Sequence, residues 1–292
     1  MKKLVFLALL LVFVGSACAA DITTGLRAWW KMDGPTDQGN TNLVADSSGN
    51  GYHMDKGGDV QWVAGGGLSF WNDYSSGIKF ADETGGISAT AKSMLSTVSN
   101  AMTVSFFINS GWTTTNNGRQ DMFTALSSTS NAKFAVEFPN SSGQAWLHAG
   151  SNGDKMIRWG STNPTSAEYI PMFGQRALIT ITKDAAAGAI NPLTGLPTGE
   201  IKLYVNGIWQ ATTTHTASWD GDHDVNGALA GMDYFRIGGR DWSWPKFGTT
   251  VDNFMIFDRA LAAEDVAALV PEPATLALLG LGGLALIRRK RN

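Results

Sequence analysis

Residues 200–212 read EIKLYVNGIWQAT and carry the clearest structural signal in the chain. Ile201, Leu203 and Val205 alternate with polar side chains, which is typical of a strand with one buried face. Asn206-Gly207 follows directly, and this dipeptide supplies the two positive φ angles of a type I′ turn. The stretch therefore predicts a β-hairpin whose second strand is Ile208–Thr212.

Similar patterns recur along the middle of the chain, separated by clusters of Gly, Asn, Ser and Thr. The further strands that we expect are Leu26–Met32, Met102–Ile108, Met122–Leu126, Lys133–Phe138, Ala177–Thr182 and Val251–Phe257. Helical periodicity is confined to Leu261–Leu269, and no Ser, Thr, Asp or Asn stands before Ala263 to cap it. Many strands with almost no helix predict an all-β sandwich or barrel.

Composition and charge exclude several classes of protein. Of the 292 residues 16% are charged, 34 are Gly and 11 are Trp, which excludes a coiled coil, a collagen-like repeat and a disordered acidic chain. Six of the 22 basic residues and one of the 25 acidic residues lie in the two ends, so the middle carries 16 and 24, a net charge of −8. We therefore expect no nucleic-acid partner, because such binding needs a basic surface.

The first 20 residues have the pattern of a secretory signal. Lys2 and Lys3 precede the apolar run Leu4–Val14, and small residues follow up to Ala20. This pattern predicts an N-terminal signal helix over residues 1–20 that signal peptidase removes. Cys18 is the only cysteine, so after ordinary cleavage the exported protein has no disulfide and no thiol chemistry. A lipoprotein site at Cys18 is the less favoured alternative, because Gly15 rather than an aliphatic residue stands three positions before it.

Residues 270–292 form a separate tail. Its apolar run, Ala274–Ile287, has 14 residues and spans about 21 Å as a helix, less than the ~30 Å hydrocarbon core of a membrane. A crossing would need residues back to about Val270, or snorkelling of the basic side chains that follow. Those residues are Arg288, Arg289, Lys290 and Arg291. Because a basic cluster stays cytoplasmic, we predict a short transmembrane helix with the body outside.

This tail resembles the PEP-CTERM sorting signal of exported bacterial proteins. The resemblance rests on Pro271, Glu272 and Pro273, the short apolar helix and the terminal basic cluster. It implies that a membrane-embedded exosortase recognises the Pro-Glu-Pro element and removes the tail. It also implies transient anchoring in the inner membrane, a final place at the cell envelope, the cell surface or the extracellular matrix, and an exopolysaccharide or surface glycan as partner.

The body, residues 21–269, resembles the LamG-like, concanavalin A-type jelly rolls. Six collinear stretches carry the resemblance: GLRAWWKMD at 25–33, VADSSGNG at 44–51, MTVSFFI at 102–108, KLYVNG at 202–207, FRIGG at 235–239 and VDNFMIFDRAL at 251–261. The resemblance implies a single antiparallel jelly-roll β-sandwich with one short C-terminal helix.

Two groups of acidic and amide residues are candidate calcium ligands. In the resembling folds the loop of Asp46 and Asn50 can meet the last-strand Asp252 around Ca²⁺, which takes six to eight oxygens. In the alternative, Asp46 and Asn50 form Asx-turns and Asp252 caps a strand end.

The second group begins at Asp222, from which the sequence reads Asp-x-Asp-x-Asn-Gly. Asp224 and Asn226 complete that motif, and Asp233 stands at the twelfth position, as in a calcium loop. The flanks are not helical, so an EF-hand is disfavoured. An isolated calcium loop and a solvated acidic turn both remain open.

Three tryptophans, Trp219, Trp242 and Trp244, lie in polar, Gly-rich surroundings beside Arg240 and Asp241. Exposed indoles stack on sugar rings while polar neighbours bond the hydroxyls. Packing into the protein is the alternative.

Enzymatic patterns are missing from the sequence. The glutamates of the body are isolated, whereas a retaining glycosidase needs two carboxyls ~5.5 Å apart, and no Gly-x-Ser-x-Gly elbow occurs. We therefore expect a non-catalytic surface or matrix module that binds carbohydrate. The alternatives are a structural or adhesive protein-binding protein and, less favoured, a glycoside-active enzyme.

Overall fold

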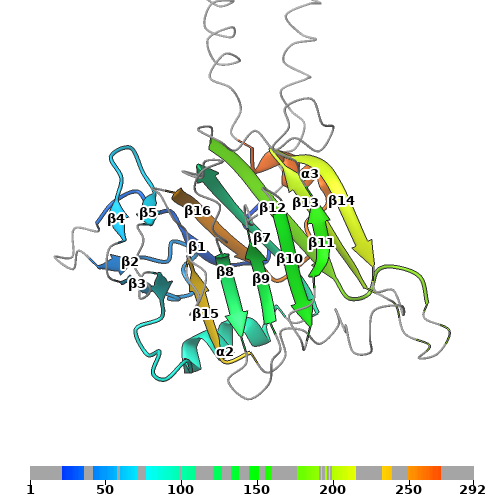
Figure 1. The fold of residues 1–292 in the computed structure, drawn as a ribbon, viewed down its shortest axis with the longest axis horizontal. Coiled ribbons are helices and arrows are strands. Elements are labelled where there is room, and N and C mark those ends of the chain that lie inside the picture. The colour runs from blue at the N-terminus through cyan, green and yellow to red at the C-terminus, as the bar shows by residue number, and fades with distance from the viewer. Residues whose placement is uncertain are drawn as a thin grey trace, which may run out of the picture.

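The structure is a computed structural model in which two antiparallel β-sheets pack against each other (Figure 1). It describes residues 22–35, 42–57, 60–70, 77–98, 100–109, 121–126, 133–137, 145–150, 155–159, 176–190, 192, 195, 197, 199–214, 232–238 and 249–270. The predicted all-β antiparallel sandwich is thereby confirmed. The predicted signal helix and tail helix lie outside these residues, and the domain boundaries stay predictions.

The first sheet is built on three long central strands. Its order is β14 (Ile208–Thr214), β13 (Glu200–Val205), β12 (Arg176–Asp184), β7 (Ala101–Asn109), β16 (Thr249–Phe257), β5 (Leu68–Phe70) and β4 (Gln61–Trp62), and β1 (Leu26–Trp30) also pairs with β16. The central strands β12, β7 and β16 come from distant parts of the chain, so the centre of the sheet is formed by long-range strand pairing.

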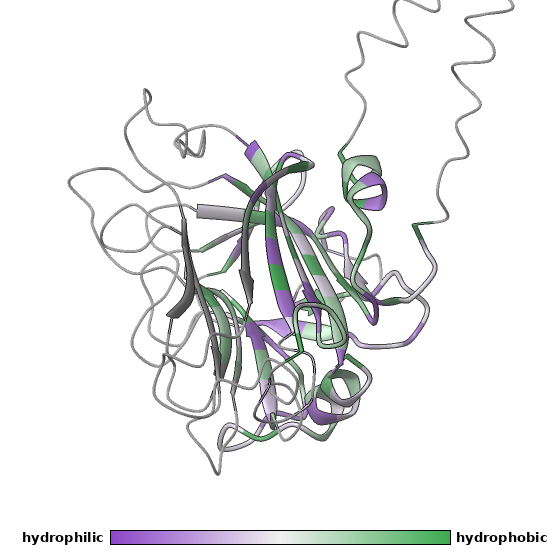
Figure 2. Ribbon diagram, turned by 90° about the vertical axis from the view of Figure 1, so that its right-hand side faces the viewer, coloured by the Kyte–Doolittle hydropathy of each residue, from purple (hydrophilic) through white to green (hydrophobic). Residues whose placement is uncertain are grey.

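The second sheet follows the order β11 (Lys155–Trp159), β10 (Ala145–Gly150), β9 (Lys133–Glu137), β8 (Asp121–Leu126), β15 (Tyr234–Ile237), β6 (Ile78–Lys79), β3 (Met54–Lys56) and β2 (Leu43–Val44). Every pairing in it is antiparallel. Figure 2 shows several strands banded in green and purple, as expected when apolar and polar residues alternate between the two faces.

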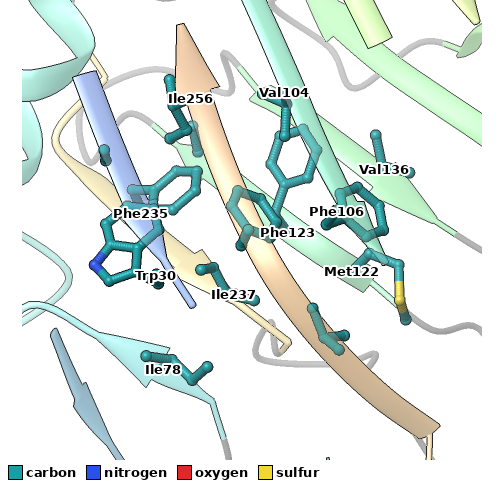
Figure 3. Packing of buried hydrophobic residues seen from close by; sticks show 14 of the residues in the cluster. Trp30, Ile78, Val104, Phe106, Met122, Phe123, Val136, Phe235, Ile237 and Ile256 are labelled. Carbon is teal, nitrogen blue, oxygen red and sulfur yellow. The ribbon is translucent and has the colours of Figure 1, made fainter. Parts of the chain in front are cut away.

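Aromatic side chains from both sheets fill the space between them (Figure 3). Trp30 of β1 stacks on Phe235 of β15 with ring centroids 6.0 Å apart. Phe106 of β7 stacks on Phe254 of β16 at 5.2 Å, and both rings meet Phe123 of β8 edge-on. These contacts supply a dense core for a body that the sequence leaves without disulfides.

A second apolar cluster lies on the outer face of the first sheet. Its buried members are Phe107, Leu178, Tyr204, Met255, Phe257, Leu261, Val266 and Leu269. The last two belong to, or directly follow, the short helix α3 (Ala263–Ala268), which therefore covers part of this face. The predicted helix is confirmed, and its N-cap residue Ala262 makes no side-chain capping bond, as expected.

The helix α2 (Ala89–Ser96) was not predicted. Ser88 caps it by accepting a hydrogen bond from the Ala91 backbone N–H at 2.9 Å, and it buries Ala91, Met94 and Leu95. Three buried residues in one short helix leave too little periodic signal to stand out in the sequence. Among the helices that the structure describes, none is long and apolar enough to span a membrane.

Candidate functional site

A cavity of about 290 Å³ opens beside β7, β12 and β16, next to the turn that joins β4 to β5. It is lined by Val63, Gly65, Gly66, Phe107, Ile108, Asn109, Arg176, Thr250 and Asp252. The polar side chains come from three adjacent strands of one sheet, so rigid elements hold them. Asp252 is the one residue here that the sequence analysis had selected.

A β-bulge in β16 aims Asp252 at the cavity. Asp252 pairs with Phe107 of β7 and Met255 with Ser105, so β16 contains one extra residue between these pairs. The extra residue is Asn253, which has a left-handed φ of 49°. The bulge resets the alternation of the strand, because Val251 and Phe254 both face the core while Asp252 stands on the outer face.

Asp252 is held by two neighbours. Arg176 Nη2 donates to Asp252 Oδ2 at 2.5 Å, and Asn253 Nδ2 donates to Asp252 Oδ1 at 3.2 Å. The Arg176 guanidinium carbon lies 3.7 Å from the centre of the Phe107 ring. The Asp252 side chain is 12% exposed and the Arg176 side chain 49% exposed, so the arginine is the accessible partner. Because the guanidinium covers the Phe107 ring, the site favours hydrogen bonding over aromatic stacking.

Glycines let the β4–β5 turn lie directly against β16. At Gly67, which has a φ of +100°, a Cβ would lie 2.7 Å from Thr250 Cγ2 and 3.1 Å from the Val251 carbonyl oxygen. Gly67 N–H also donates to the Met32 carbonyl at 2.7 Å. Gly65 has a φ of +92° but no atom within 4 Å of its Cβ position, so it faces open space at the rim. The turn therefore forms a fixed wall of the cavity.

The residues of the first predicted calcium group have different partners: Asp46 and Asn50 bond to the backbone of their own loop and of β1, and Asp252 bonds to Arg176. Asp46 accepts backbone hydrogen bonds from Trp29 (2.9 Å), Ser48 (2.8 Å) and Tyr52 (3.0 Å). Asn50 Nδ2 donates to the Leu26 and Arg27 carbonyls, which ties the loop to β1. The Asx-turn geometry of the alternative is thus present at Asp46, while Asp252 faces Arg176.

The other predicted site residues lie mostly outside the described part of the chain. Asp233 lies next to β15, where its carboxylate is 3.5 Å from Lys92 Nζ of α2. The residues outside are Asp222, Asp224, Asn226, Trp219, Arg240, Asp241, Trp242, Trp244, Pro271, Glu272, Pro273, Arg288, Arg289, Lys290 and Arg291. Among the described residues no group of three or more His, Cys, Asp or Glu side chains could hold a metal ion. Both calcium sites remain predictions.

Sequence reasoning missed Arg176 and Asn109. Each stands one residue outside the limits of a predicted strand, and the two are paired in the register of β12 and β7. Arg176 and Asp252 are 76 positions apart, so only the strand order brings them together.

Two family models match the chain. One, described as the concanavalin A-like lectin/glucanases superfamily, matches residues 81–267. The other, the PEP-CTERM protein-sorting motif, matches residues 269–291 and indicates an exported, envelope-associated protein. Among curated proteins, none matches the sequence significantly.

Three solved structures illustrate the shared fold. The receptor-binding domain of the botulinum neurotoxin C/D mosaic serotype has a TM-score of 0.57 and 14% identity, covering 84% of this chain and 51% of that chain. The type G domain has a TM-score of 0.54 and 15% identity, covering 84% and 50%. Trypanosoma rangeli sialidase has a TM-score of 0.55 and 14% identity, covering 84% and 32%. The chain thus spans about half of the neurotoxin domains and about a third of the sialidase, and the likeness shows the fold alone.

Proposed function

Because the chain belongs to the concanavalin A-like lectin/glucanase superfamily and carries a PEP-CTERM sorting motif, we propose that it is an exported, non-catalytic carbohydrate-binding module. Its ligand is an exopolysaccharide or a surface glycan, which it binds at the cell surface or in the extracellular matrix. An exosortase removes the C-terminal tail after recognising Pro271-Glu272-Pro273.

The cavity beside Arg176 is the observation that carries this proposal. It places a guanidinium, a carboxylate, an amide and a hydroxyl on three rigid strands within about 290 Å³. Sugar hydroxyls donate and accept hydrogen bonds, and this set of side chains offers both functions. The volume lies at the small end of the range for ligand pockets, which suits one sugar unit better than a long stretch of chain.

The similar structures support binding in general terms. Two of them are receptor-binding domains, and the Trypanosoma rangeli sialidase has been solved with sialic acid. Since this chain covers only part of each, their receptors and their chemistry are not transferred to it.

The test is a pull-down of the exported protein with exopolysaccharide from the organism that makes it. Arg176→Gln should weaken binding at least tenfold, which corresponds to the loss of one charged hydrogen-bonding group at about 1.4 kcal/mol or more. Arg27→Gln is the matched control, because Arg27 is also a half-exposed partner of an aspartate, Asp258, but lies outside the cavity.

Each other outcome points to a different site or function. Unchanged binding by Arg176→Gln, with binding lost in the Trp242→Ala, Trp244→Ala double variant, would move the sugar site to the predicted tryptophan platform. Capture of surface proteins without polysaccharide would favour the adhesive alternative. Turnover of labelled polysaccharide would favour an enzyme.

A further inference from the structure

Two exposed apolar residues, Ile208 and Trp209, follow each other where the predicted hairpin turns. Ile208 pairs with the core residue Val205, so its side chain and that of Trp209 stand on opposite faces of the hairpin tip. Ile208 is 66% exposed and Trp209 is 57% exposed, and they are consecutive residues at the start of β14. Trp209 stands opposite Tyr204 in the register of β13 and β14, and Tyr204 belongs to the apolar cluster on the outer face of the first sheet. Opposite residues of an antiparallel pair share a face, so Trp209 stands on the face that α3 partly covers.

The C-terminal tail leaves the body at this same place. A Cβ on Gly207, in the hairpin turn, would lie 2.9 Å from Val270 Cγ2 and 3.2 Å from Ala267 Cα. The turn between β13 and β14 therefore touches both α3 and the last described residue of the chain. In Figure 1 these elements lie together at one end of the body, and α2 lies at the opposite end.

The length of chain beyond Val270 sets how far this end can be from a membrane. Three residues, Pro271 to Pro273, separate Val270 from the apolar run Ala274–Ile287. Four residue steps reach about 14 Å at full extension. The run itself is about 9 Å shorter than the hydrocarbon core, so a spanning tail draws its flanking residues toward the interface.

We propose that the β13–β14 hairpin docks on the outer lipid surface of the membrane while the tail is attached, with Ile208 and Trp209 in the interfacial layer. The proposal rests on the sorting tail of the proposed function being inserted in the membrane before its removal, and it is independent of sugar binding. Tryptophan prefers this layer because its ring is apolar and its N–H is polar. No charged residue lies between Asn206 and Gln210, so docking does not require anionic lipid and zwitterionic lipid is a sufficient partner.

Docking by the hairpin depends on the tail. Even one fatty acyl chain gives only marginal, reversible membrane binding, and two side chains bury less apolar surface than that. Removal of the tail therefore releases the hairpin from the lipid together with the body.

The test uses the full chain without its signal peptide, reconstituted in phosphatidylcholine vesicles. This chain has no cysteine, so Ile208→Cys introduces a single labelling position. Ser93→Cys on α2, which is also exposed, is the matched control at the other end of the body. With brominated acyl chains in the vesicles, we expect quenching of a fluorophore at position 208 and none at position 93. Adding Trp209→Ser to the Ile208→Cys chain should reduce that quenching.

The outcomes separate the two proposals. If the protein floats with the vesicles and position 208 is not quenched, the tail inserts but the hairpin does not dock. If the protein does not float, the inserted tail and the docking are both refuted. Equal quenching at both positions would refute an oriented body. If the fluorophore at position 208 is quenched without lipid, and more strongly at higher protein concentration, the hairpin contacts a second copy of the chain instead of the membrane.

Discussion

Replacement of Gly67 by alanine tests whether the β4–β5 turn is seated against β16. The new Cβ would lie 2.7 Å from Thr250 Cγ2, a distance that a carbon pair does not tolerate. Gly67→Ala carries two costs. An L-residue at positive φ costs about 1–2 kcal/mol, and overpacking against Thr250 costs about 1–3 kcal/mol more. We therefore expect a loss of about 2–5 kcal/mol from a total stability on the order of 5–15 kcal/mol.

Gly65→Ala is the control for this substitution. Gly65 also has a positive φ, but nothing lies within 4 Å of its Cβ position, so only the backbone cost applies, about 1–2 kcal/mol. Urea unfolding measures both losses as changes in midpoint at constant slope. Thr250→Ser removes the clashing methyl group and should restore part of the stability of Gly67→Ala, while the Val251 carbonyl at 3.1 Å keeps the rescue incomplete. Equal losses for the two glycine variants, with no rescue, would refute the seating of the turn.

Three further predictions concern the core, α2 and processing. Phe254→Leu should cost about 1–3 kcal/mol more in urea unfolding than Phe257→Leu, because both side chains are fully buried but Phe254 contacts four aromatic rings. Burial by itself raises the pKa of Asp82, but hydrogen bonds from Ser88 and Thr90 outweigh it and hold the pKa below 3.8. The ionised Asp82 therefore stabilises the folded protein above pH 3.8, and this contribution is lost as the pH falls through the lower pKa of the folded state. In Asp82→Asn the melting temperature should depend less on pH in this acid range. A pH dependence equal to that of the unchanged protein would contradict the assignment. Intact mass of the native product should show a C-terminus after Leu269 and before Arg288.

The fold could be predicted because its longest strands, β7, β12 and β16, each carry a local signal. The strands β10 and β11, with six and five residues, were not predicted. The strands β13 and β14 begin at the predicted residues, Glu200 and Ile208. The prediction is accurate here because alternation and an Asn-Gly turn are both properties of neighbouring residues. The strands β2 to β6 have two or three residues each, which is too short for any period to appear. The helix α2 depends on tertiary burial and on its cap at Ser88 rather than on helical propensity.

The candidate site could be predicted only in part, and for a related reason. Asp252 was selected only through the resemblance of residues 251–261 to the closing strand of LamG-like domains, and the bulge at Asn253 that turns it toward the cavity was not predicted. Arg176 lies outside that resemblance and carries no local mark. Its role follows from the register that joins β12, β7 and β16 across 76 positions, and strand order is not encoded in any short stretch.

The junction between body and tail sets a limit on where the tail can be removed. Leu269 is 7% exposed and packs in the outer cluster with Val266, yet the matched sorting motif begins at this residue. A cut before Leu269 would remove a buried member of the outer cluster and leave the outer face of the first sheet without part of its cover. A cut after Val270 removes only residues beyond the cluster. The same packing that places Val270 next to the hairpin therefore requires the cut to fall beyond the cluster, so that the body keeps its cover when the tail is lost.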